Sequence, residues 1–358
     1  MLRLSAIPRT VVHRSPSSFL QPKVNLPLIL RHSFHEDYKP GREEQTLRLS
    51  SGATLGFAEY GSQKDDATPA FFFHGAPGAR YDGLGYHKAA LNLNVRIICP
   101  DRPGHGLSTH VPSRKLIDYP KEISELARHL KLSKYHVFGQ SGGGPYAVAC
   151  AMASPANELL SSTVVAGIGP PGSVTTSIAG YYTVFALSLH KYMPSTLQKL
   201  MAWYYSPAFL NDEVKLQKHL DSMYKWLPKE DQKVIADPKA QPVIREVLKA
   251  AFAQHATGVV RDGEIYARQE LWGFELKDVK RPIGLIFGKQ DTRTPVAFGR
   301  YYKQHLRDAW LWEIEDASHF RLEQYLEPIL ARVVGKEVLQ EERKVNSSES
   351  REAANQKQ

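Results

Sequence analysis

Cysteine is scarce in this chain: Cys99 and Cys150 are the only two, and both stand in apolar segments. Two cysteines cannot build a disulfide framework, so we expect buried free thiols and an intracellular protein. No spacing typical of metal ligands surrounds them, and nothing in the sequence predicts a metal or an organic cofactor. Long apolar runs are also missing. In the N-terminal segment the longest apolar stretch, 26–30, is broken by Pro27, which argues against a secretory signal. No stretch of the chain reaches the about 18 apolar residues that a membrane span needs.

Acidic residues are absent from the first 35 positions. The basic side chains there are Arg3, Arg9, Arg14, Lys23 and Arg31. This Arg- and Ser-bearing composition is typical of a mitochondrial transit peptide, and the alternative is an unstructured extension on a cytoplasmic protein. The net charge of +9 is weak evidence for nucleic acid, and no Lys/Arg stripe with interleaved aromatic residues is present. We therefore expect no nucleic-acid partner.

Short apolar segments alternate with helix-patterned ones, which predicts an α/β fold with a mostly parallel sheet and helices on both faces. The predicted strands are 46–50, 54–60, 70–73, 95–99, 135–138, 162–168, 283–287 and 310–314. The predicted helices are 117–130, 145–153, 178–192, 195–205, 214–226, 241–256, 264–271 and 320–334. The helical block between the sixth and seventh strands is too long for an ordinary crossover and indicates an inserted cap.

These patterns predict five segments. They are an N-terminal extension (1–40), the first part of a core (41–169), a helical cap or lid (170–281), the second part of the core (282–334) and a disordered tail (335–358). Six aromatic residues of the cap, Tyr181, Tyr182, Phe185, Trp203, Tyr204 and Tyr205, stand at mixed helical spacings. We expect most of them to form the core of the lid and a few to line an apolar pocket.

The most informative motif is Gly139-Gln140-Ser141-Gly142-Gly143, which reads G-x-S-x-G. A predicted strand precedes it and a predicted helix follows it. Strand, sharp turn and helix are the context in which this motif forms a nucleophile elbow, with the serine lifted out of the backbone and glycines allowing main chains to pass close by. The motif therefore predicts that Ser141 is a nucleophile.

A serine hydroxyl needs a general base, and a histidine base needs a carboxylate to hold its tautomer. In elbow enzymes the chain order is Ser, then Asp or Glu, then His. Asp291 and His319 supply that order, and each follows a predicted strand. Because open α/β sheets place their sites at the carboxyl ends of strands, we expect Ser141, Asp291 and His319 to form a catalytic triad.

Acyl transfer also needs two preorganised N–H donors for the oxyanion. The residue after the nucleophile supplies one, so we expect the backbone N–H of Gly142 to serve. The other should come from the loop after the 70–73 strand, His74-Gly75-Ala76-Pro77-Gly78. Ala76 is our choice there, because Pro77 has no N–H.

Taken together, these motifs resemble the α/β-hydrolase superfamily over residues 70–320. The matching segments are 74–78, the Asp-Arg-Pro-Gly-His-Gly-Leu-Ser loop at 101–108, the Ser141 elbow, Asp291 and His319-Phe320. The resemblance implies an eight-stranded core with a helical lid over Ser141. Segments 141–147 and 272–276 are similar to a large group of cap-bearing microbial and fungal hydrolases. A serine at the elbow argues against haloalkane dehalogenases and epoxide hydrolases, which use aspartate there.

The leading hypothesis is hydrolysis of a carboxylic ester or thioester of a small, apolar acyl substrate through an acyl-enzyme. One alternative is a peptidase or amidase, since the His-Gly-x-Pro-Gly loop resembles that of proline iminopeptidases, although Gly142 stands where their elbow usually has tryptophan. Lactone or carbon–carbon cleavage and acyl transfer use the same triad. A different class is a hydrolase-fold protein that binds a ligand with little turnover.

Overall fold

The computed structural model describes residues 41–173 and 178–336, with only the backbone described over 178–184. The predicted N-terminal extension (1–40) and nearly all of the predicted tail (335–358) lie outside these residues. The side chains of Tyr181 and Tyr182 also lie outside the described part.

Eight strands of the described chain form one sheet in the order β1-β2-β4-β3-β5-β6-β7-β8. They are β1 (Gln45–Arg48), β2 (Thr54–Gly61), β3 (Thr68–Phe73), β4 (Val95–Pro100), β5 (Tyr135–Gln140), β6 (Leu159–Val165), β7 (Ile283–Gly288) and β8 (Ala309–Ile314). The β1–β2 and β2–β4 pairs are antiparallel, and every other pair is parallel. The predicted fold class, a mostly parallel eight-stranded sheet with helices, is confirmed.

Alternating side chains of the central strands pack on opposite faces of the sheet. In β3, Phe71 and Phe73 point into one hydrophobic cluster, while Ala70 and Phe72 point into the other. Helices α3 (Tyr119–His129), α4 (Gly144–Ala153) and α12 (Val296–His305) contribute to the first cluster, and α2 (His87–Asn92) and α13 (Leu326–Val333) to the second. Central parallel strands are therefore covered on both faces, which is why their sequences are continuous apolar runs.

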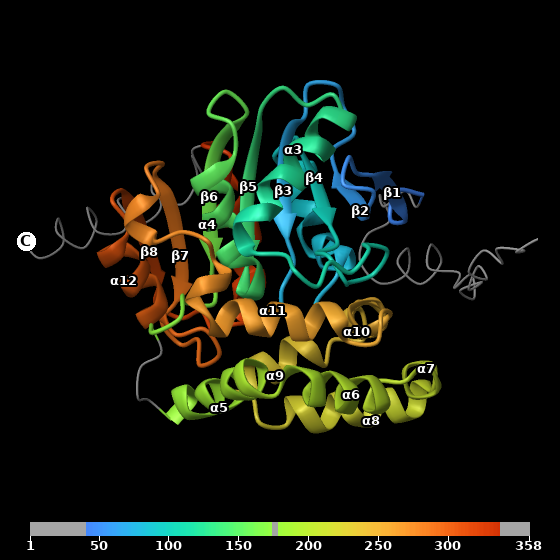
Figure 1. The fold of residues 1–358 in the computed structure, drawn as a ribbon. Coiled ribbons are helices and arrows are strands. Elements are labelled where there is room, and N and C mark those ends of the chain that lie inside the picture. Colours follow the sequence, from blue (N-terminus) through green and yellow to red (C-terminus); the bar gives the residue numbers. More distant parts are fainter. Residues whose placement is uncertain (1–40, 174–177, 337–358) are drawn as a thin grey trace, which may run out of the picture.

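The chain between β6 and β7 forms seven described α-helices, which we call the helical layer. They are α5 (Ile178–Tyr192), α6 (Pro194–Tyr204), α7 (Pro207–Leu210), α8 (Glu213–Tyr224), α9 (Lys229–Ile235), α10 (Ala240–Phe252) and α11 (Thr257–Ala267). Helices α10 and α11 lie next to the sheet, and α5, α6 and α8 lie beyond them on the outside (Figure 1). The layer has a small apolar core of its own, centred on α8 and α10.

Several predicted bounds were wrong. The strand predicted over 162–168 is β6, Leu159–Val165, and it ends where Ala166 adopts a left-handed φ of 43°. The helix predicted over 264–271 is α11, which begins at Thr257 after two residues with positive φ, His255 and Ala256. The short helices α7 and α9 were missed because each spans too few residues to show a helical period.

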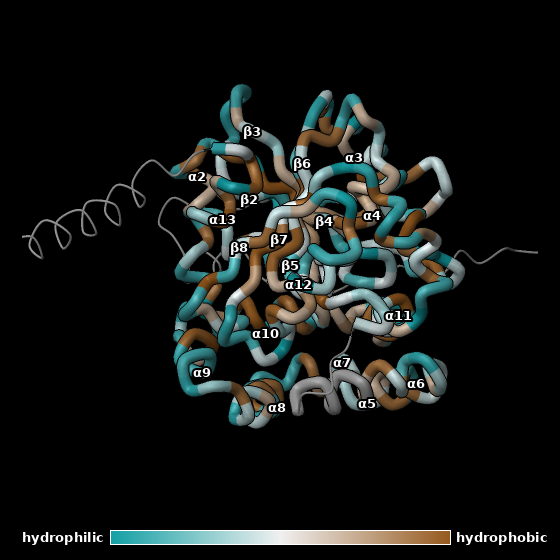
Figure 2. Tube along the Cα trace, turned by 90° about the vertical axis from the view of Figure 1, so that its left-hand side faces the viewer, coloured by the Kyte–Doolittle hydropathy of each residue, from teal (hydrophilic) through white to brown (hydrophobic). Residues whose placement is uncertain are grey.

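Hydrophobic residues concentrate in the central strands β4, β5 and β7, and hydrophilic ones in the loops at the rim (Figure 2). Brown segments also occur in the outermost helices α6 and α8. Within the described residues, no helix combines the length and the apolar character that crossing a lipid bilayer requires. The same residues include no group of three or more His, Cys, Asp or Glu side chains placed to hold a metal ion.

Candidate active site

Ser141 occupies the sharp turn between β5 and α4, as the motif predicted. Its φ is 53°, in the left-handed region that a non-glycine residue seldom adopts. The turn is possible because glycines flank it: a Cβ at Gly139 would overlap the Gly143 carbonyl, and a Cβ at Gly143 would overlap the Phe73 carbonyl of β3. Ile168, in the loop after β6, fixes the turn, since its N–H donates to the Ser141 carbonyl at 2.9 Å.

Asp291 and His319 come together at the ends of neighbouring strands. Asp291 follows β7 and His319 follows β8, and 2.7 Å separates Asp291 Oδ2 from His319 Nδ1. The other carboxylate oxygen, Oδ1, accepts N–H bonds from Arg293 at 2.8 Å and Thr294 at 2.9 Å, and Oδ2 also accepts from Thr294 Oγ1 at 2.8 Å. Burial alone would raise the pKa of Asp291, but its bonds to His319 and Thr294 lower the pKa below its usual value. Asp291 is therefore ionised at neutral pH.

Ser141 and His319 open onto the same cavity, of about 450 Å³, which we call the serine cavity. The hydrogen bonds of the described residues do not include one between Ser141 Oγ and the His319 ring. A base and its nucleophile are often further apart in a ligand-free site than in the substrate complex. The structure thus places Asp291 in direct contact with His319, and it places Ser141 and His319 in the lining of the same cavity.

The loop after β3 lies against the serine turn. A Cβ built on Gly142 would stand 2.6 Å from Ala76 Cβ and 3.1 Å from Ala76 N, so the two predicted oxyanion donors are close neighbours. Tyr266 of α11 secures this arrangement, because its hydroxyl donates to the Gly142 carbonyl at 2.8 Å. A side chain at position 142 would fill the space between the two loops.

Arg102 holds the same loop from below. Its guanidinium donates to the carbonyl of His74 and, at 2.8 Å, to that of Gly75. Arg102 also donates through Nε to Asp262 of α11, at 2.7 Å. The partner of Arg102 on α11 lies 160 positions away in the chain and left no sequence signal.

Asp262 is the centre of a fully buried charge cluster. Arg114 and His105 face it, the latter with Nε2 at 3.1 Å, and Tyr146 donates its hydroxyl at 2.6 Å. Burial opposes ionisation of Asp262, yet Arg102 and Arg114 hold its pKa well below the usual value. The cluster therefore ties the helical layer to the loop that carries Ala76.

Asp231 of α9 makes a second link between the helical layer and the site. Its Oδ1 accepts from Ser318 Oγ at 2.5 Å and from the Phe320 N–H at 3.1 Å. These two residues flank His319, so a single carboxylate of the helical layer is hydrogen-bonded to the histidine loop on both sides of His319. Sequence reasoning missed Asp231, because a lone aspartate in a charged segment has no pattern to mark it.

The serine cavity is apolar on the side of the helical layer. Its layer residues are Met223, Tyr224, Val234, Ile235, Ala240, Val243, Ile244, Val247 and Leu248. Three charged residues from outside the helical layer also line the cavity: Asp82, Arg293 and Glu323. Asp82 accepts the Gly75 N–H at 3.3 Å, and burial raises its pKa to about 7.

Among the cap aromatic residues whose side chains the structure describes, the expected lid core holds for Tyr205, which packs against the apolar core of the helical layer, and fails for the other three. Phe185, Trp203 and Tyr204 are exposed rather than forming a lid core, and neither they nor Tyr205 line the serine cavity. Tyr205 instead stacks on Phe252, with ring centroids 3.8 Å apart. Helical spacing alone did not reveal which face of α5 and α6 turns outward.

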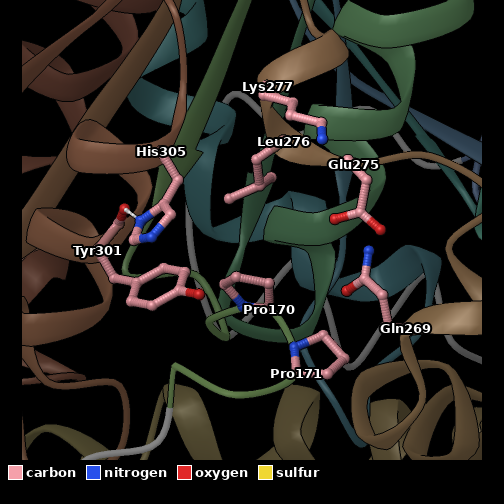
Figure 3. Close-up of a pocket in the computed structure, with 8 residues that line it drawn as sticks. All are labelled: Pro170, Pro171, Gln269, Glu275, Leu276, Lys277, Tyr301 and His305. Atoms are coloured by element: carbon pink, nitrogen blue, oxygen red, sulfur yellow. Dashed lines mark hydrogen bonds between the residues drawn. The ribbon is translucent and has the colours of Figure 1, made fainter.

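A second, smaller cavity of about 250 Å³ lies between the loop after β6 and α12 and contains none of the predicted site residues (Figure 3). Its walls are Pro170, Pro171, Gln269, Glu275, Leu276, Lys277, Tyr301 and His305. The rings of Tyr301 and His305 stack at 3.9 Å, and His305 Nδ1 lies 2.8 Å from the Tyr301 carbonyl. We assign no chemistry to this cavity.

A sheet covered on both faces thus carries a serine on a left-handed turn after β5 and a His–Asp pair after β7 and β8, the arrangement that the motifs predicted for a hydrolase. In agreement, residues 70–332 match the model of the alpha/beta hydrolase family, and the chain belongs to that family.

Named relatives differ in activity. The sn-1-specific diacylglycerol lipase ABHD11 of Danio rerio is 26% identical over 161 residues, which is 44% of this chain and 48% of that protein. The chain thus spans about half the length of this relative. The proline iminopeptidase of Lactobacillus acidophilus is 25% identical over 282 residues, 75% of this chain and 89% of that protein. Among solved structures, an esterase from Exiguobacterium antarcticum has a TM-score of 0.55 at 16% identity, covering 81% of this chain and 99% of that chain. These comparisons support hydrolase activity.

Proposed function

We propose that the chain is a serine hydrolase of carboxylic esters or thioesters that works through an acyl-enzyme. One observation carries the proposal: Ser141 on its left-handed turn and His319 in contact with Asp291 face one cavity. A triad is defined by such geometry and roles rather than by sequence position. The lipase relative supports the ester reading, and the family supports hydrolysis in general.

In this mechanism Ser141 Oγ adds to the substrate carbonyl carbon while its proton passes to His319 Nε2. Asp291 accepts the Nδ1–H of His319, which leaves Nε2 as the basic nitrogen and stabilises the imidazolium. The tetrahedral oxyanion accepts the backbone N–H groups of Gly142 and Ala76. His319 then returns the proton to the leaving alcohol or thiol, and the acyl group stays on Ser141.

Deacylation repeats these steps with water as the nucleophile. His319 removes a proton from the water molecule, whose oxygen adds to the acyl carbon, and the same two N–H groups hold the second oxyanion. Collapse breaks the acyl–oxygen bond, and Ser141 recovers its proton from His319. No step in this sequence calls for a metal or an organic cofactor.

The walls of the serine cavity favour an apolar acyl group. We propose that residues 170–281 act as a cap joined to core segments 41–169 and 282–334, and that aliphatic side chains of α9 and α10, such as Val234, Val243 and Val247, contact the acyl chain. A cavity of about 450 Å³ is within the size range of small-molecule sites.

The direct test compares the wild type with Ser141→Ala. The wild type should hydrolyse short-chain p-nitrophenyl esters and bind a fluorophosphonate probe covalently, and the variant should do neither. Ser51→Ala is the matched control, since Ser51 lies on an exposed turn far from the cavity. Equal labelling of wild type and Ser141→Ala would refute the assignment.

A peptidase of the proline-iminopeptidase type is the second candidate, favoured by the match over 75% of the chain. The two readings differ in leaving group. We expect the ratio of kcat/KM for a p-nitrophenyl ester over proline p-nitroanilide to be far above one. A preference for the anilide that Ser141→Ala abolishes would establish the peptidase. A measurable ligand affinity without turnover would instead favour a binding protein.

The acid-free segment 1–35 supports mitochondrial targeting as a further proposal, with a cytoplasmic location as the alternative. A fluorescent fusion of the full chain should enter mitochondria, and the same fusion without residues 1–35 should not. Diffuse cytosolic fluorescence of the full-length fusion would rule the targeting role out.

A further inference from the structure

The outer face of α5 and α6 exposes large apolar side chains. They are Phe185, Tyr192, Met193, Leu200, Trp203 and Tyr204, and we call this set the outer apolar face. Trp203 is 76% exposed and Leu200 58%, values far from those of a helix packed in a core. Single exposed apolar residues are common on protein surfaces. A patch of large apolar side chains on two consecutive helices instead marks a site of contact with a protein or a membrane.

Helical spacing explains why these side chains point the same way within each helix. Leu200 and Trp203 are three positions apart on α6, and Phe185 and Tyr192 are seven apart on α5. The opposite sides of α5 and α6 pack against α11. There His190 of α5 meets Gly263 so closely that a Cβ at position 263 would overlap the imidazole. The inward sides are therefore committed to α11, and the outward sides are left to solvent.

Charge on this surface has one sign. No Asp or Glu occurs between Glu158 and Asp212, a stretch that includes all of α5 and α6. Lys191 and Lys199 are exposed beside the apolar side chains. The next acidic residues along the chain, Asp212 and Glu213, stand at the start of α8, which also carries lysines. An apolar, aromatic and cationic surface without its own carboxylates complements a negatively charged apolar boundary.

We propose that the outer apolar face docks on the surface of an anionic lipid membrane. Tryptophan and tyrosine favour the level of the lipid headgroups, where an apolar ring and a polar tip are both accommodated. Leu200, Met193 and Phe185 would enter the acyl boundary, as on amphipathic helices that lie in the interface, and the lysines would face lipid phosphates. A protein partner offers no comparable reason for a face free of acidic groups. This proposal does not depend on the ester-hydrolase function.

The test is vesicle binding by the full chain. Wild type should sediment with vesicles of phosphatidylcholine and phosphatidylglycerol and much less with pure phosphatidylcholine. Leu200→Glu should weaken partitioning into the vesicles by about tenfold. The leucine that the membrane would bury is lost, and the glutamate places a negative charge next to the negatively charged lipid phosphates. Trp203→Glu should act in the same direction.

Leu160→Glu is the matched control. Leu160 is 52% exposed, close to the value for Leu200, but it stands near the amino end of β6 in the core sheet, away from the helical layer. This variant should bind as the wild type does. Circular dichroism checks that all variants are folded. Equal vesicle binding by Leu200→Glu and Leu160→Glu, or no binding by the wild type, would overturn the proposal.

Size-exclusion chromatography over a range of concentrations distinguishes another occupant. If the wild type dimerises through this face, Leu200→Glu will be monomeric and the wild type will not bind vesicles. That result would also refute the membrane proposal. Vesicle binding that survives both glutamate substitutions would place the lipid contact elsewhere on the chain.

Discussion

Arg102 and Asp262 form a buried ion pair, with Arg102 Nε 2.7 Å from Asp262 Oδ2, across the contact between the loop after β4 and helix α11. The same guanidinium donates to the Gly75 carbonyl. The position of the loop that carries Ala76 therefore depends on a carboxylate in the helical layer. Such a pair adds little net stability when complete, but it is costly to break from one side.

Replacing Asp262 by Asn should destabilise the protein strongly. Arg102 and Arg114 would then be buried without a counter-charge, which costs about 3–5 kcal/mol in the free energy of unfolding. Urea denaturation followed by circular dichroism measures this cost. Glu230→Gln, which breaks the exposed Lys233–Glu230 pair, is the control and should leave the midpoint unchanged. Similar midpoints for the two variants would show that Arg102 and Arg114 do not need the charge of Asp262 for stability.

Asp231→Asn should lower kcat more than it raises KM. The substitution weakens the bonds to Ser318 and Phe320 and loosens the loop that places His319. A displacement of catalytic groups by about 1 Å can cost on the order of 100-fold in rate. Steady-state kinetics on a p-nitrophenyl ester gives the split, and Asp237→Asn, at an exposed position nearby, is the control. A change in KM alone would assign Asp231 to substrate binding.

Asp291→Asn should reduce kcat by roughly 10⁴-fold, because an amide favours the wrong tautomer of the histidine and cannot stabilise its cation. Thr294→Val removes the hydroxyl contacts with Asp291 Oδ2 and His319 Nδ1 but keeps the carboxylate, and should have a much smaller effect. Since the pKa of Asp291 is lowered in the folded state, ionised Asp291 stabilises the fold above its unfolded pKa of about 4, and this contribution is lost as pH falls. Equal kcat for Asp291→Asn and wild type would remove Asp291 from the mechanism.

Asp82 should make the protein less stable as pH rises, which is the opposite of the effect of Asp291. Its folded pKa of about 7 lies above the unfolded value, so the folded state binds more protons between about pH 4 and pH 7. The free energy of unfolding should therefore fall across this window as pH rises, by up to about 4 kcal/mol. Asp82→Asn should flatten that dependence and be the more stable protein at pH 8. Denaturation midpoints from pH 4 to pH 8 measure it, and parallel curves would contradict the assignment.

The sequence predicted those parts of the fold and site that depend on local patterns. The turn at Ser141 is specified by adjacent glycines, and the places of Asp291 and His319 follow from the strands just before them. Their contact at 2.7 Å then results from the pairing of β7 with β8. The catalytic roles of these residues stay predictions until the variants are assayed.

What the sequence could not predict depends on contacts between distant segments. Asp231 and Asp262 act across 89 and 160 positions in the chain, and neither belongs to a motif. The outward orientation of Trp203 was missed for a similar reason, because helical spacing defines a face but not its neighbours. Strand β6 was misplaced by three residues, since it ends at the left-handed turn of Ala166, where Gly167 passes close to Gly144 at the start of α4.

The carboxylates of Asp231 and Asp262 limit how readily the helical layer can be replaced by that of another hydrolase. Asp231 reaches the His319 loop, and Asp262 reaches the Gly75 loop through Arg102. Helices taken from another hydrolase to alter selectivity would leave both loops unsupported unless acids were supplied at the same two points. Selectivity in this chain therefore cannot be transplanted as a separate module, and engineering should redesign the cavity-facing side chains of α9 and α10 in place.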